Sequence, residues 1–215
     1  MTHIDSFLDL FHSPPKQKFI KIALIGDGSV GKTSYFERIL FGDTDDYKFN
    51  KYYDATKGCN VCQIDYMIGQ HTITVHLFDT AGQEKFGTLR DSYLIGVDGV
   101  IVMYDITNKA TKQNVLTKWI PDIKRVLSAS KCQKYVPIAV VGNKCDKMDN
   151  ADADVHVSSL RAATLNGYYG SNFGQIDHYY VSVKADENLM KPINWLLKNI
   201  LSYYLNVNAK KIRKS

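Results

Sequence analysis

The 215-residue sequence lacks any apolar run approaching the roughly 20 residues that cross a bilayer, which argues against a membrane-spanning segment. Its start lacks the basic region of a secretory signal and carries Asp5 and Asp9 within the apolar stretch. Cysteine is scarce: four residues are too few for a secreted disulfide framework, so we expect a reducing compartment, the cytosol or the nucleus. Internal repeats and low-complexity tracts are also missing, and the length predicts one domain.

A strong surplus of one charge is absent too. The net charge is +5 and the isoelectric point is near 8.8, short of the dense basic stripe of a nucleic-acid binder. We therefore expect no nucleic-acid partner. Cys59 and Cys62 form a C-x-x-C pattern, but side chains three apart in a strand point to opposite faces, so we interpret both as ordinary strand residues.

Strand-like and helix-like segments alternate from Lys18 onward. Buried strands are predicted at 19–25, 60–66, 72–78, 99–105, 136–142 and 178–183, the second and third joined by a short turn containing Gly69. Helices are predicted at 32–40, 113–127, 155–165 and 189–205. The pattern predicts an α/β fold: a six-stranded, mostly parallel sheet with one antiparallel hairpin strand, helices on both faces, and a ligand site at the carboxyl ends of the strands.

The segment GDGSVGKT, from Gly26 to Thr33, satisfies G-x-x-x-x-G-K-[ST] between a predicted strand and a predicted helix. Backbone N–H groups of such a loop and the helix N-terminus present positive charge to phosphates. Lys32 should reach the β- and γ-phosphates, and the Thr33 hydroxyl should ligate Mg²⁺. The nucleotide-binding residues predicted here are Asp27, Gly28, Ser29, Val30, Gly31, Lys32, Thr33 and Ser34. This loop alone leaves ATPases, kinases and GTPases open.

The segment DTAGQE follows another predicted strand. Asp79 comes at the strand end, where it can hold Mg²⁺ through water. Gly82 can offer its N–H to a γ-phosphate, and the Gln83 amide can orient an attacking water. These residues indicate nucleotide hydrolysis.

The segment Asn143-Lys144-Cys145-Asp146 follows the predicted strand at 136–142. A carboxylate at Asp146 can accept hydrogen bonds from N1–H and the 2-amino group of guanine, a donor pair that adenine lacks. An unpaired buried carboxylate would cost a few kcal/mol, which makes this group a guanine filter. Asn143, Lys144 and Asp146 are therefore predicted to bind the base.

These motifs, in this order, resemble the Ras-superfamily small GTPases from Phe19 to about Leu205. DTAGQEKFGTLRDSYLIG, from Asp79 to Gly96, and the Tyr179-Tyr180 pair followed by KPINWLLK resemble the Ran branch, the nuclear-transport GTPases. The resemblance implies a P-loop G domain that binds GTP or GDP with Mg²⁺ and hydrolyses GTP slowly. It also implies an exchange factor, a GTPase-activating protein and karyopherin-type transport receptors as partners of a monomer found in nucleus and cytoplasm.

The resemblance also implies roles for further residues. Thr56 resembles the switch I threonine that ligates Mg²⁺ and contacts the γ-phosphate, and Phe49 resembles the aromatic that packs on guanine. Ser182, Val183 and Lys184 occupy the place of the family's SAK segment, with the Val183 N–H directed at guanine O6 and some crowding from the valine methyls. The catalytic set is then Gln83, Lys32 and Thr56, and the metal set is Thr33, Thr56 and Asp79 through water.

The chain departs from the Ran pattern in several places. The approach to switch I is longer and carries Asp43, Asp45 and Asp46, and a second insertion lies around 128–135. An acidic tail is replaced by the basic AKKIRKS. A Rab-like vesicle-trafficking GTPase and a low-turnover GTP-binding scaffold remain alternatives, although no cysteine follows Cys145 to carry a lipid anchor.

The termini divide the chain into an N-terminal extension (1–17), a G domain (18–206) and a basic tail (207–215). Helical spacing of Ile4, Phe7, Leu8 and Phe11 is compatible with either a short amphipathic helix that docks or a loosely ordered extension. The basic tail is compatible with a nuclear-localisation element, a contact to acidic membranes, or a solvated end.

Overall fold

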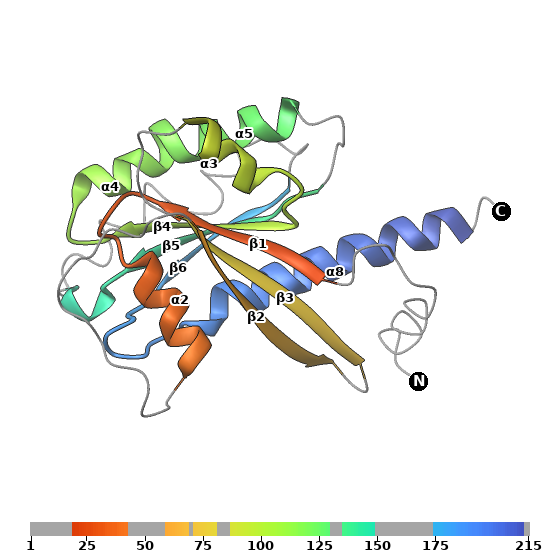
Figure 1. The fold of residues 1–215 in the computed structure, drawn as a ribbon, viewed down its shortest axis with the longest axis horizontal. Coiled ribbons are helices and arrows are strands. Elements are labelled where there is room, and N and C mark those ends of the chain that lie inside the picture. Colours follow the sequence, from red (N-terminus) through yellow and green to blue (C-terminus); the bar gives the residue numbers. More distant parts are fainter. Residues whose placement is uncertain are drawn as a thin grey trace.

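The computed structural model describes residues 19–42, 59–68, 71–80, 87–129, 135–148 and 174–212. Six strands form one sheet in the order β2-β3-β1-β4-β5-β6 (Figure 1). Their bounds are β1 Phe19–Gly26, β2 Cys59–Ile68, β3 His71–Thr80, β4 Gly99–Asp105, β5 Ile138–Asn143 and β6 Ile176–Tyr180. Neighbouring strands are parallel except for β2, which pairs antiparallel with β3. The α/β prediction with one antiparallel strand is confirmed.

Helices cover both faces of the sheet, as predicted (Figure 1). On one side lie α2 (Lys32–Phe41) and α8 (Met190–Ile212). On the other lie α3 (Gly87–Leu94) and a continuous helical stretch made of α4 (Lys109–Asn114), a π-helical turn η2 (Val115–Trp119) and α5 (Ile120–Ala129). None of the helices within the described ranges combines the length and apolar character needed to cross a membrane.

Two apolar layers hold these helices to the sheet, because successive side chains of a strand point to opposite faces. In β1, Ile22 and Leu24 join the cluster beneath α2 and α8, whereas Ala23 and Ile25 join the cluster beneath α3, η2 and α5. All four side chains are fully or almost fully buried. The central strand is therefore apolar on both faces, as its continuous apolar sequence indicates.

Burying both faces of the parallel strands leaves their ends as the place for polar groups. Strands β1, β3, β4, β5 and β6 run parallel, so their last residues meet at one edge of the sheet. Those residues are Gly26, Thr80, Asp105, Asn143 and Tyr180. The three sequence motifs are thereby brought to the same edge, where α/β folds bind ligands.

Several predicted boundaries need correction. The helix predicted at 113–127 begins at Lys109 and ends at Ala129. Strand β6 spans Ile176–Tyr180 and not 178–183, because its pairing with β5 starts at Ile138 opposite Ile176 and the chain turns after Val181. Strand β5 begins at Ile138, two residues after the predicted start. The last helix continues to Ile212, so part of the predicted tail is helical. The helix Gly87–Leu94 was not predicted.

Both described members of the C-x-x-C pair behave as strand residues. Cys62 is buried in the core beneath α2 and α8, whereas Cys59 is half-buried, and neither forms a disulfide. Within the described ranges, no group of three or more His, Cys, Asp and Glu side chains is arranged to hold a metal ion. The predicted helix at 155–165, the N-terminal extension, the Gly69 turn and the three aspartates before switch I lie outside the described residues.

Candidate functional site

The loop between β1 and α2 passes so close to β4 and β5 that two of its positions have no room for a side chain. Gly26 has a φ of 146°, and a Cβ there would collide with the carbonyl oxygen of Met103 on β4. Gly31 has a φ of 95°, and a Cβ there would collide with the amide of Asn143. Ser29 adopts a φ of 63°, a left-handed conformation that is uncommon for residues other than glycine. The glycines thus let the loop lie against two neighbouring strands.

Lys32 folds back over this loop. Its ammonium group is buried and donates to the carbonyl oxygens of Gly26 at 2.8 Å and Asp27 at 2.6 Å. Lys32 is also the first residue of α2, whose N-cap Gly31 supplies no side-chain hydrogen bond to the first turn. A buried cation and an N-terminus without a side-chain cap together favour an anion at this position.

Thr33 and Asp79 meet across the β1–β3 pair. The Thr33 hydroxyl donates to Asp79 Oδ2 at 2.8 Å, while Asp79 Oδ1 is buried without a hydrogen-bond partner among the described residues. Burial raises the pKa of Asp79 to about 6, against the hydrogen bond from Thr33 and the charge of Lys32. A hydroxyl and a buried carboxylate with an unsatisfied oxygen suit a hard cation such as Mg²⁺, which takes oxygen ligands.

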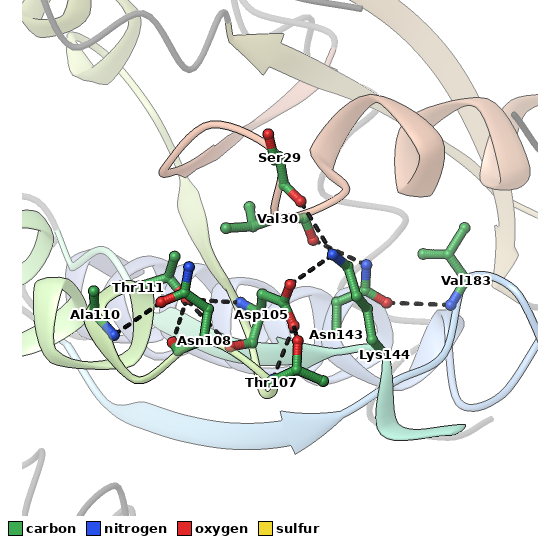
Figure 2. A network of polar contacts seen from close by, with 10 residues as sticks. All are labelled: Ser29, Val30, Asp105, Thr107, Asn108, Ala110, Thr111, Asn143, Lys144 and Val183. Carbon is green, nitrogen blue, oxygen red and sulfur yellow. Dashed lines mark hydrogen bonds and ion pairs between the residues drawn. The ribbon is translucent and has the colours of Figure 1, made fainter. Parts of the chain in front are cut away.

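Asn143 connects the loop to the segment after β6. Its amide nitrogen donates to the carbonyl oxygen of Val30 at 3.0 Å, and its amide oxygen accepts from the N–H of Val183 at 3.2 Å (Figure 2). The resemblance predicted that the Val183 N–H donates to guanine O6. In this structure the same N–H donates to the Asn143 side chain. The Val183 side chain is buried in the apolar core. The methyl groups that valine has in addition to alanine therefore pack against apolar neighbours, a contact that the prediction of crowding at the base did not consider.

Asp146 is exposed on the short helical turn η3 (Cys145–Lys147), and Ser182 sets its orientation. The Ser182 hydroxyl donates to Asp146 Oδ1 at 2.6 Å and accepts from the N–H of Ala185 at 3.0 Å. Because the hydroxyl is held from both sides, the carboxylate has a fixed direction without being covered. Lys184 is exposed on the same segment.

Lys144 spans two parts of the site (Figure 2). Its ammonium donates to the carbonyl oxygen of Ser29 at 3.3 Å and pairs with Asp105 Oδ2 at 2.6 Å. Burial acts to raise the pKa of Asp105, but hydrogen bonds from Lys144 and Thr107 outweigh it and lower the pKa. Asp105 therefore stays ionised and holds Lys144 beneath the loop.

Sequence reasoning missed Asp105 and Thr107. Thr107 donates to Asp105 Oδ1 through its N–H at 2.9 Å and through its hydroxyl at 2.7 Å. A signal for Asp105 was available, because it is the last residue of a buried strand whose carboxyl end lies at the same edge as the motifs. Thr107 has no such signal, since its role depends on the turn that follows β4.

The structure thus brings the described predicted residues together in two groups. Lys32, Thr33 and Asp79 lie at one end, and Asn143, Lys144, Asp146 and the segment from Ser182 to Lys184 lie at the other, joined by the loop from Asp27 to Gly31. Phe49, Thr56, Gly82 and Gln83 lie outside the described residues, so their predicted roles stay predictions.

The sequence matches the model of the Ras family over residues 21–202. The match covers the phosphate-binding loop, DTAGQ, NKCD and the segment after β6. The matched residues include nearly all of the six-stranded sheet. Members of this family are GTPases that bind guanine nucleotides. The chain belongs to the Ras family of small GTPases.

Proposed function

We propose that this protein is a Ran-like GTP/GDP switch that hydrolyses GTP and acts in nucleocytoplasmic transport. One observation carries the nucleotide assignment: Asn143 joins the phosphate-binding loop at Val30 to the base-binding segment at Val183. A ligand bound here contacts a cationic end and an acidic end that are fixed relative to each other. A guanine nucleotide has the matching order of groups, phosphates at one end and a donor-bearing base at the other.

Phosphate binding rests on Lys32 and the first turn of α2. The buried ammonium is already positioned by two carbonyl oxygens, so it can approach phosphate oxygens without a large loss of side-chain freedom. Thr33 and Asp79 are the described residues that would hold Mg²⁺, with Thr56 as the third predicted ligand. Bound Mg²⁺ neutralises charge on the phosphate oxygens.

Base selection rests on Asp146. Its exposed carboxylate, oriented by Ser182, can accept the two donors of guanine. Adenine presents no such donor pair at those positions, so an ATP complex would leave the carboxylate facing an acceptor. The protein should therefore bind GTP and GDP in strong preference to ATP.

Switching rests on residues outside the described ranges. Thr56 and Gly82 would contact the γ-phosphate and order both switch segments, and hydrolysis would release them. Gln83 would orient the attacking water. By the mechanism of the family, we expect slow intrinsic hydrolysis and an activating protein that adds on the order of 10³ to 10⁵ in rate.

The transport role rests on sequence resemblance to the Ran branch in DTAGQEKFGTLRDSYLIG and KPINWLLK. Karyopherin-type receptors are the proposed partners of the GTP form, with the nucleus and cytoplasm as its location. A vesicle-trafficking role is the alternative.

A pull-down with the full chain tests this role. The Gln83→Leu variant loaded with GTP should capture karyopherin-type receptors, and the Thr33→Asn variant loaded with GDP should not. Stable association of the GTP form with vesicle membranes, with no captured receptor, would overturn the transport role and favour the alternative.

A further inference from the structure

Asp27 lies in the phosphate-binding loop, and its carboxylate accepts hydrogen bonds from the helical stretch formed by α4 and η2. The residue is 6% exposed. Its Oδ2 accepts a hydrogen bond from Asn114 Nδ2 at 2.8 Å, and its Oδ1 accepts one from Trp119 Nε1 at 3.0 Å. Lys118 adds a cation 3.9 Å from Oδ1 and lies 4.7 Å from the Trp119 ring centre. Both oxygens of this loop carboxylate are therefore bound to one short stretch of helix.

The π-helical turn is what brings these two donors together. Asn114 and Trp119 are five positions apart: Asn114 directly precedes η2 and Trp119 is its last residue. The N–H of Ile120 donates to the carbonyl oxygen of Val115. In an α-helix five positions rotate a side chain by about 140°, onto nearly the opposite side. The wider turn returns the fifth residue to the side of the first. An ordinary α-helix through this segment would direct only one of the two side chains at Asp27.

The main chain of the same aspartate is bound to the phosphate-binding lysine. The Asp27 carbonyl oxygen accepts from Lys32 Nζ at 2.6 Å, the shorter of the two hydrogen bonds that position this ammonium. The carboxylate and the carbonyl of Asp27 thus connect η2 on one side to Lys32 on the other. A shift of the aspartate side chain would move the carbonyl that orients the lysine.

We propose that Asn114 and Trp119 are positioning residues of the nucleotide site: through Asp27 they fix the phosphate-binding loop and Lys32, and thereby slow nucleotide release. This inference rests on the nucleotide binding proposed above. Neither residue belongs to the motifs that identify the family. Their contribution is to keep the loop in the conformation that binds phosphate.

The dissociation rate of a fluorescent GDP analogue from the full chain, with Mg²⁺ present, tests the proposal. Trp119→Phe removes the indole N–H and should raise the rate about tenfold, the effect of losing one hydrogen bond to a charged group. Trp195→Phe is the matched control, because Trp195 lies on α8, partly buried against the core of the opposite face. It should leave the rate unchanged.

A double-mutant cycle separates positioning from general destabilisation. In an Asp27→Ala background, Trp119→Phe should no longer change the dissociation rate, since the acceptor is already gone. Asn114→Ala, at a half-buried helical position, gives the same test if Trp119→Phe does not fold. Equal rates for the parent and Asn114→Ala, or an unchanged Trp119→Phe effect without Asp27, would overturn the proposal. Failure of the parent to bind the analogue would instead overturn the nucleotide assignment.

Discussion

The hydroxyl of Thr33 and the carboxylate of Asp79 are joined by a 2.8 Å hydrogen bond, although they lie 46 positions apart in the sequence. Thr33 is the second residue of α2, and Asp79 lies near the end of β3, which pairs with β1. The parallel pairing places both oxygens at the same edge of the sheet. The oxygen ligands proposed for Mg²⁺ are thereby adjacent through the fold itself.

Replacing Thr33 by Asn should weaken Mg²⁺-dependent GTP binding by about tenfold or more, because the substitution removes an oxygen ligand and the hydrogen bond to Asp79. GDP binding should fall less, which favours the inactive form. Equilibrium titrations of both nucleotides at fixed Mg²⁺ measure the two effects. Thr33→Ser keeps the hydroxyl and should behave as the parent; equal losses in both variants would contradict the assigned role.

The affinity for Mg²⁺ should decrease when the pH is lowered below about 6. Burial raises the pKa of Asp79 to about 6, so the proton competes with the cation in the range where this carboxyl is protonated. Each unit below the pKa should lower the apparent affinity by about tenfold. Mg²⁺ titrations of the GDP complex between pH 7.5 and 5 measure this. A parent protein that binds Mg²⁺ equally well at pH 5 and 7.5 would contradict the prediction, and Asp79→Asn should show weak binding at every pH.

Acid should destabilise the fold through His178. This ring lies on β6 and shares a 3.0 Å hydrogen bond with the Tyr104 hydroxyl. Burial and the charge of Lys112 lower its pKa to about 4, against the charge of Asp177. The unfolded chain therefore takes up a proton near pH 6.5 that the folded chain refuses until about pH 4, and stability is lost as the pH falls between these values.

The full loss from this histidine is about 3 kcal/mol, from 1.36 kcal/mol per pKa unit. Urea unfolding at pH 7 and pH 4.5 measures most of this loss, which is complete near pH 4. His178→Gln should be less stable than the parent at pH 7 but lose less on acidification. An equal acid-induced loss in both proteins would show that other groups account for it.

Replacing Asp105, the partner of Lys144, should lower the binding affinity for GTP and for GDP by the same factor. Asp105→Asn lowers the charge that holds Lys144 beneath Ser29, so we expect about a tenfold loss of affinity for GTP and for GDP. Asp186→Asn is the matched control, because Asp186 pairs with Arg38 at 2.9 Å on the surface, where such pairs contribute little. A loss confined to GTP, or an equal loss in the control, would contradict this role.

The sequence predicted those elements whose local pattern decides their structure. The apolar run 99–105 was placed without error, because a strand buried on both faces needs no periodicity to be recognised. The end of β6 was not, since the run continues through Val181 and Val183, and only the turn stabilised by the Ser182–Glu187 bridge ends the pairing with β5.

The sequence predicted those site residues that belong to recognisable motifs. Lys32, Thr33 and Asp79 were placed together because their two motifs lie at the carboxyl ends of two parallel strands, β1 and β3. Thr107 and Trp119 were not, because their contacts depend on the turn after β4 and on a π-helical turn, neither of which has a local sequence signature here. The segment Gly87–Leu94 also lacks a clear apolar period, which explains why its helix was missed.

Single-turnover GTP hydrolysis by the full chain, with Mg²⁺ and an ATP comparison, is the sharpest test of the proposed guanine-specific GTPase activity. We expect slow conversion of bound GTP to GDP, no binding of ATP at comparable concentration, and a Gln83→Leu variant that binds GTP but does not turn it over. A Gln83→Leu variant that hydrolyses GTP as fast as the parent, or a parent that binds ATP as well as GTP, would contradict it.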